Sequence, residues 1–135
     1  MDYVYKFPVV RGVQAGKEYY IAMVPLKMLP KLFPTEEEYV IPEYRAQRRL
    51  NEARIPVISK YILSNRDSYV FSALAASIDG NYTFIKNKRN QDTGTLEVSM
   101  DAKFLINDGQ HRKSAILEAL KQDETLGDET ISIVF

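Results

Sequence analysis

The chain has 135 residues, of which 45% are hydrophobic, and its 18 lysine and arginine residues equal its 18 aspartate and glutamate residues. This length suits a single domain, and a net charge of zero gives no support for non-specific binding to nucleic acid or membranes. The absence of cysteine excludes disulfides, thiolate metal sites and cysteine nucleophiles, and a single histidine argues against a zinc site. Because there is no apolar stretch of about 20 residues and no signal-peptide start, we expect a cytoplasmic protein without a membrane segment.

The first part of the chain predicts a β-hairpin followed by helices. Residues 3–10 and 19–24 are rich in β-branched and aromatic residues and flank a turn at 14–17. Pro25 can open a short helix through Leu29, which Pro30 and Pro34 would interrupt. The remaining segments are an acidic loop at 35–38, a helix at 43–54, and a second helix with Pro56 in its first turn that reaches about Ser64.

The second part alternates strands and loops around one helix. The predicted strands are 69–78, 82–85, 95–100, 103–106 and 131–135, with loops at 86–94 and 124–129 and a helix at 110–121. Strands and helices are mixed without regular alternation, so the expected class is α+β. Since the sequence stops at an apolar strand, we expect residues 1–135 to be one domain and a fragment of a longer protein.

The most informative segment is Asp108-Gly109-Gln110-His111-Arg112, where an apolar strand gives way to the helix at 110–121. The free backbone N–H groups at the start of a helix attract anions. Arg112 lies at the unfavourable end of the helix dipole, which costs about 0.3–1 kcal/mol. A cation in this position is explained most simply if an anion binds between it and the amides.

The neighbours of this turn indicate how it is built. Ala115, Ile116, Ala119 and Leu120 form one apolar stripe, and Arg112 lies one turn before it, so its side chain should reach over the edge of the core. Asp108 is placed to cap the helix, and Gly109 permits a backbone conformation that a Cβ would obstruct. The competing interpretation is purely structural, with a cap, a turn and a solvated first helical turn.

A second candidate is the basic helix predicted at 43–54. Arg45, Arg48 and Arg49 fall within about a third of a turn, and with Arg54 they outweigh Glu43 and Glu52 to leave a charge of 4 − 2 = +2. Arginine favours bidentate contacts with phosphate, so these four residues are candidate DNA contacts. The alternative is a solvated helix paired with Glu36–Glu38. Lys86, Lys88 and Arg89 are a further, weaker candidate.

The Asp-Gly-Gln-His-Arg motif, with Ala115 three positions on, resembles the motif of the DGQHR-domain proteins. Residues 42–56, 69–74 and 77–80 are similar to DndB, a family of the bacterial DNA phosphorothioation (DNA sulfur modification) system. This resemblance covers roughly residues 24–135. It implies a DNA-binding transcriptional repressor that acts on the promoter of the modification gene cluster, with other proteins of that system as further partners. DndB proteins are longer than this chain, which agrees with a fragment.

More distantly, Gly109, Arg112 and Ala115 match the nucleotide-binding turn of the ParB/sulfiredoxin fold, which implies a mixed sheet flanked by helices. In that fold the turn binds nucleotide phosphates, so Gly109, Gln110, His111 and Arg112 are candidate nucleotide contacts. Gln110 replaces the sulfiredoxin cysteine, which excludes that chemistry. The alternative function is therefore a module of the same system that binds or hydrolyses a nucleotide, namely ATP with Mg²⁺, with Asp108 and His111 as catalytic candidates and no resident metal.

Overall fold

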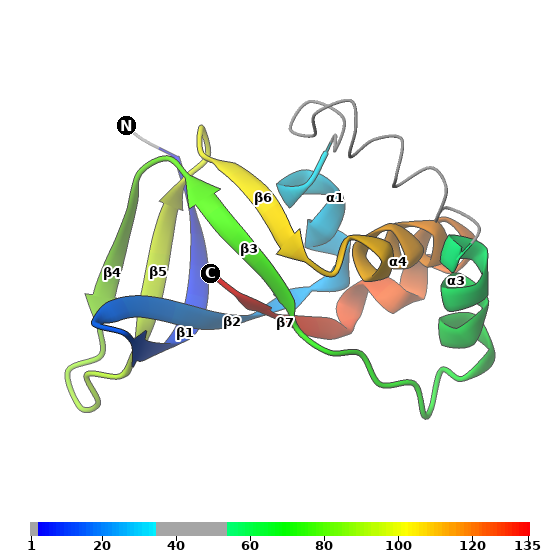
Figure 1. Ribbon diagram of the computed structural model, residues 1–135, viewed down its shortest axis with the longest axis horizontal. Helices are drawn as coiled ribbons and strands as arrows, with labels where there is room; N and C mark the ends of the chain where they lie inside the picture. The colour runs from blue at the N-terminus through cyan, green and yellow to red at the C-terminus, as the bar shows by residue number, and fades with distance from the viewer. Residues whose placement is uncertain (1–2, 35–53) are drawn as a thin grey trace.

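A computed structural model describes residues 3–34 and 54–135, which form a curled sheet with helices at one end (Figure 1). In chain order the elements are β1 (Val4–Gln14), β2 (Lys17–Pro25), the 3-10 helix η1 (Leu26–Met28), α1 (Leu29–Leu32), α3 (Arg54–Ser64), β3 (Leu74–Asp79), β4 (Tyr82–Lys86), β5 (Thr93–Ser99), β6 (Lys103–Asp108), α4 (Gln110–Gln122), the 3-10 helix η3 (Glu124–Asp128) and β7 (Thr130–Val134). The α+β class is confirmed.

The seven strands form one mixed sheet in the order β4-β5-β1-β2-β7-β3-β6. All neighbouring strands are antiparallel except β3 and β7, which run parallel and pair only at Leu74–Ile133 and Ala75–Val134. The remainder of β3 separates from β7 and pairs with β6 on its other side. The sheet therefore curls, and Figure 1 shows β3 diverging from β7 beyond the start of β3.

The predicted N-terminal hairpin is confirmed, and its turn explains its register. Ala15 and Gly16 both have positive φ angles, 52° and 75°. Two such residues form the tight turn whose twist matches that of the flanking strands. Gln14 consequently pairs with Lys17, and the register continues to Val9 opposite Ala22.

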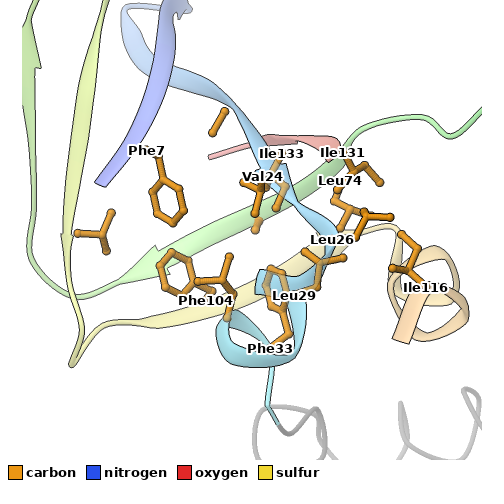
Figure 2. Close-up of a cluster of buried hydrophobic side chains, with 14 of the residues drawn as sticks. Phe7, Val24, Leu26, Leu29, Phe33, Leu74, Phe104, Ile116, Ile131 and Ile133 are labelled. Atoms are coloured by element: carbon orange, nitrogen blue, oxygen red, sulfur yellow. The ribbon is translucent and has the colours of Figure 1, made fainter. Parts of the chain in front are cut away.

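The core lies inside the curl of the sheet and extends to α4. Phe7, Val24 and Phe104 come from three strands, and Ile116 on α4 and Leu29 on α1 close the end (Figure 2). Each of these side chains is at most 5% exposed. Burial of one such side chain contributes about 1.5–3 kcal/mol, so this cluster fixes where α4 begins relative to the sheet.

A polar cluster fixes the chain between α3 and β7. The Arg66 guanidinium contacts the carboxylates of Asp123 and Glu129, and Nη2 lies 2.7 Å from Glu129 Oε2. The Tyr69 hydroxyl donates to the other oxygen of Glu129. Hydrogen bonds from Tyr69 and then Arg66 hold the pKa of Glu129 below its usual value. Burial, followed by the bond to Glu129, raises the pKa of Tyr69 to about 12.

Two details of the predicted elements are wrong. Pro30 does not interrupt a helix, because it lies in the first turn of α1, where its missing N–H costs no hydrogen bond. Residues 69–73 are not a strand, because Tyr69 bonds to the backbone of Asn65 and to Glu129 instead of to a neighbouring strand.

The bounds of the remaining described elements are closer to the predicted ones. Strand β6 extends to Asp108, and the loop at 124–129 forms η3. The predicted helix at 43–54 lies outside the described residues except for Arg54, the first residue of α3. None of the helices within residues 3–34 and 54–135 is long and apolar enough to cross a membrane.

Candidate functional site

The turn at 108–112 is built around the backbone of Gly109. This residue joins the end of β6 to the start of α4 with φ 101° and ψ 23°, a left-handed conformation. A Cβ here would lie 2.5 Å from Leu74 Cδ2 and 2.9 Å from Arg112 Nη2. Glycine is therefore required both for the backbone angle and for the close approach of β3 and the guanidinium. The prediction that Gly109 permits an otherwise obstructed conformation is confirmed.

The helix cap differs from the predicted one. Gly109, rather than Asp108, occupies the N-cap position of α4. Asp108 is the last residue of β6 and pairs with Ala75 of β3. Its carboxylate is 79% exposed and lies 3.7 Å from Arg112 Nη2.

Arg112 reaches back across the edge of the core, as its spacing from the apolar stripe predicts. Its Nη2 donates to the carbonyl oxygen of Ala73 at 3.0 Å, which joins α4 to the segment before β3. The side chain is 28% exposed. Its Nε is buried and forms no hydrogen bond with any residue in the described part of the chain. The guanidinium thus has a structural partner and also unused donor capacity.

The other residues of the first helical turn are half-buried or buried. His111 Nε2 is buried and has no hydrogen-bond partner within residues 3–34 and 54–135. Gln110 begins the helix and is half-buried. Lys113 is only 2% exposed, and this burial lowers the pKa of its ammonium group to about 8. Sequence reasoning missed Lys113, although it lies three residues before Ile116, on the same face of the helix.

The turn carries the backbone N–H groups of a helix N-terminus and the partly exposed Arg112 guanidinium, whereas the His111 Nε2 is buried. Such groups at a helix N-terminus suit an anion, and the nearby Asp108 carboxylate partly offsets the positive charge. Among the described residues, no group of three or more histidine, aspartate or glutamate side chains could hold a metal ion. Any role of Asp108 or His111 in catalysis stays a prediction.

Of the four predicted DNA contacts, Arg54 lies within the described residues. Arg45, Arg48 and Arg49 lie outside the described residues. Arg54 is exposed at the start of α3, which packs against α4. The basic loop at 86–89 lies between β4 and β5, at the opposite end of the molecule from α4 (Figure 1).

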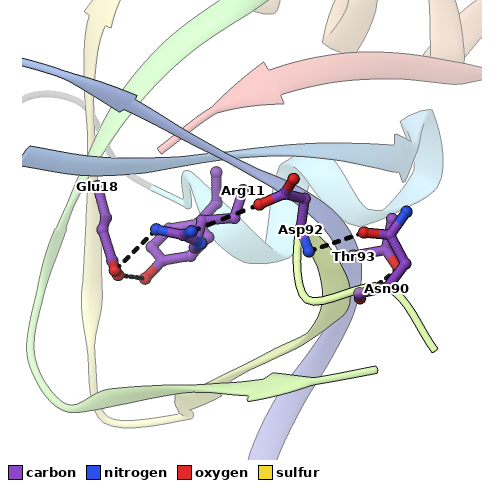
Figure 3. Close-up of polar contacts among 6 residues, drawn as sticks. Arg11, Glu18, Asn90, Asp92 and Thr93 are labelled. Atoms are coloured by element: carbon purple, nitrogen blue, oxygen red, sulfur yellow. Dashed lines mark hydrogen bonds and ion pairs between the residues drawn. The ribbon is translucent and has the colours of Figure 1, made fainter. Parts of the chain in front are cut away.

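A second polar cluster, missed by sequence reasoning, joins β1, β2 and the β4–β5 loop (Figure 3). Arg11 Nη1 lies 3.0 Å from Glu18 Oε1, and Nη2 lies 3.4 Å from Asp92 Oδ1. The Tyr20 hydroxyl donates to Glu18 Oε2 at 2.7 Å. This bond, more than the guanidinium, lowers the pKa of Glu18. Burial and the same bond raise the pKa of Tyr20 to about 12.

Comparison with models of protein families gives a match. The family model DndB, described as DNA-sulfur modification-associated, matches residues 7–135. No curated protein and no solved structure shows significant similarity to the chain, so the expected likeness to the ParB/sulfiredoxin fold stays a prediction.

Proposed function

The chain belongs to the DndB family of DNA-sulfur modification-associated proteins, and we propose that it is a DNA-binding regulatory protein of a bacterial DNA phosphorothioation system. In this proposal it acts as a transcriptional repressor on the promoter of the modification gene cluster, and other proteins of that system are its further partners. The match over residues 7–135 is the observation that carries the proposal.

The charge pattern supports DNA as the ligand. Arg45, Arg48, Arg49 and Arg54 are concentrated within ten residues of a chain whose overall charge is zero. Arginine side chains bind phosphate oxygens through two parallel N–H donors, and these contacts position a protein on DNA without reading its sequence. Arg54, the member of this set within the described residues, is exposed.

The salt dependence of DNA binding tests this proposal. Fluorescence anisotropy with promoter duplex and with a scrambled duplex gives the affinity at several salt concentrations. Replacing Arg48 or Arg49 with glutamine should reduce the slope of log K against log salt by about one each, because one phosphate contact is lost. Lys121→Gln, which changes an exposed lysine near the end of α4, is the control and should leave the slope unchanged. Equal slopes in all variants, or equal affinity for both duplexes, would contradict the proposal.

A nucleotide-binding role for the same protein is a second candidate function. The N-terminus of α4 favours it, together with the Arg112 guanidinium, which is 28% exposed and donates to the Ala73 carbonyl through Nη2. ATP with Mg²⁺ would place its phosphates against the amides of Gly109 and Gln110 and the Arg112 guanidinium. In hydrolysis, Asp108 would orient the metal or a water, with His111 beside the phosphates.

Thermal unfolding with ATP and Mg²⁺ tests the second candidate. A ligand present at 100 times its Kd stabilises the folded state by about 2.7 kcal/mol, which raises the melting temperature measurably. Arg112→Ala should abolish this shift, and Lys121→Gln should keep it. A shift that survives Arg112→Ala would reject the placement of the phosphates at this turn.

A further inference from the structure

We propose that a groove at the mouth of the curled sheet binds a nucleobase. The groove has a volume of about 370 Å³ and lies where β3 separates from β7. Its lining includes Glu18, Tyr20, Ala76, Tyr82, Asn107 and Phe135. The open mouth of a curled or closed sheet is a common position for small-molecule sites, and this volume exceeds that of one base.

Aromatic side chains form one wall of the groove. Tyr20 packs against Phe84, with ring centroids 5.2 Å apart, and is almost fully buried. The Tyr82 ring stands at 71° to the Tyr20 ring, with centroids 6.4 Å apart, yet Tyr82 is 51% exposed. A fixed ring beside an exposed ring leaves an aromatic surface on which a flat heterocycle can stack. The small side chains of Ala75 and Ala76 leave room for it.

Two hydrogen-bond acceptors are fixed in place around this wall. Arg11 and Tyr20 each donate to one oxygen of the Glu18 carboxylate, so its orientation is set while about half of its acceptor positions stay open. The Asn107 Nδ2 donates to Ser77 Oγ at 2.7 Å, which leaves the amide oxygen as an acceptor. Because Arg11 offsets the charge of Glu18, the groove suits a neutral donor better than a second cation.

These features define the ligand by its chemistry. The fixed acceptors suit N–H donors, and the aromatic wall suits a flat ring that carries them at its edge. Guanine presents its N1–H and its amino group side by side, a pattern that one carboxylate can accept in bidentate fashion. Adenine and cytosine offer an amino group alone, and uracil and thymine offer a single ring N–H. We therefore expect guanine to bind most tightly, either as a free nucleotide or as an unpaired base in single-stranded DNA.

Calorimetric titration of the whole chain with GMP, IMP and UMP tests the base preference, because IMP lacks only the guanine amino group. GMP should bind about ten-fold more tightly than IMP or UMP. Tyr82→Ala should weaken GMP binding about five-fold or more through lost stacking, and Glu18→Gln should remove the preference over IMP. Tyr3→Ala, at a 71% exposed tyrosine outside the groove, and Glu118→Gln on α4 are matched controls that should change neither value.

Guanosine without phosphate and single-stranded oligonucleotides with or without guanine complete the experiment. Guanosine should retain the effects of Tyr82→Ala, since the groove contacts only the base. Tighter binding of the guanine oligonucleotide than of GMP would identify a DNA strand as the source, and the reverse would identify a free nucleotide. Equal affinities for GMP, IMP and UMP would overturn the proposal. A second pattern would also overturn it: guanosine fails to bind, and Arg112→Ala abolishes GMP binding while Tyr82→Ala does not. That result would place GMP at the turn at 108–112 and not in the groove. Circular dichroism of each variant confirms that the fold is retained.

Discussion

Replacement of Gly109 by alanine perturbs the centre of the candidate turn through two separable effects. The first is conformational. An alanine held at a φ of 101° costs about 1–2 kcal/mol relative to an allowed conformation. The second is steric, because the new Cβ would lie 2.5 Å from Leu74 Cδ2, and the core must shift to accept it. Overpacking of this kind costs about 1–3 kcal/mol.

A smaller opposing effect comes from the unfolded chain. Alanine restricts the unfolded state more than glycine does, which offsets about 0.4–1 kcal/mol of the loss. The expected decrease in the free energy of unfolding is therefore about 1–5 kcal/mol. A domain of this size is typically stable by only about 5–15 kcal/mol, so the change should be easy to measure.

Gly16→Ala supplies the matched control for this measurement. Gly16 also has a positive φ, 75°, but a Cβ there would meet no atom within 4 Å. Gly16→Ala should lower the free energy of unfolding by about 1 kcal/mol, from the unfavourable backbone conformation alone. Urea unfolding followed by circular dichroism gives both values. If Gly109→Ala costs no more than Gly16→Ala, the packing of Leu74 against the turn is not the constraint that we describe.

Three further predictions concern the polar cluster around Glu129, the contact between α3 and α4, and the Arg112 guanidinium. Hydrogen bonds from Tyr69 and Arg66 lower the pKa of Glu129, so its contribution to stability is full above the unfolded value of 4.5 and is lost as the pH falls through the lower folded value. Urea unfolding should therefore show a gap between wild type and Glu129→Gln near neutral pH that narrows below about pH 4.5, and a constant gap would contradict this. Ile62→Ala, at a fully buried position on α3, should cost about 2–5 kcal/mol in the same assay, whereas a cost under 1 kcal/mol would show that α3 does not pack as described. Arg112→Lys should lower the melting temperature and weaken any ATP-induced shift, because one ammonium cannot replace the planar fork; an unchanged shift would mean that charge alone suffices.

Local turn chemistry made much of the fold predictable. The hairpin of β1 and β2 follows from a two-residue turn whose neighbours alternate in burial, and the start of α4 follows from a glycine between a strand and an apolar stripe. The segment at 69–73 was misassigned because its aromatic residues favour strands. The partner that decides its conformation, Glu129, lies 60 residues away from Tyr69 in the chain.

The candidate sites likewise combine features that depend on neighbouring residues with contacts between residues distant in the chain. The position of the turn at 108–112 could be predicted because five consecutive residues indicate it. The acceptor of Arg112 is the carbonyl of Ala73, 39 residues away, and Asp92 approaches Arg11 across 81 residues. Such partners depend on strand register, which a single sequence does not determine. The groove beside Tyr82 could not be predicted, because its lining comes from several strands whose register was unknown. In addition, a tyrosine in a strand ordinarily packs into the core.

The contacts of Arg112 decide whether a side chain that joins α4 to the segment before β3 can also bind an anion. Its bond to the Ala73 carbonyl uses one of five N–H donors, so that bond can persist when a ligand arrives. Its charged neighbour, Asp108, is largely exposed and 3.7 Å away, and an ion pair of this kind contributes only about 0–1 kcal/mol. A phosphate bound here, as in the proposed nucleotide-binding role, would therefore have to displace little. The energetic cost of orienting the guanidinium is already met by packing against Gly109 and by the Ala73 bond, so the fold itself preorganises the cation.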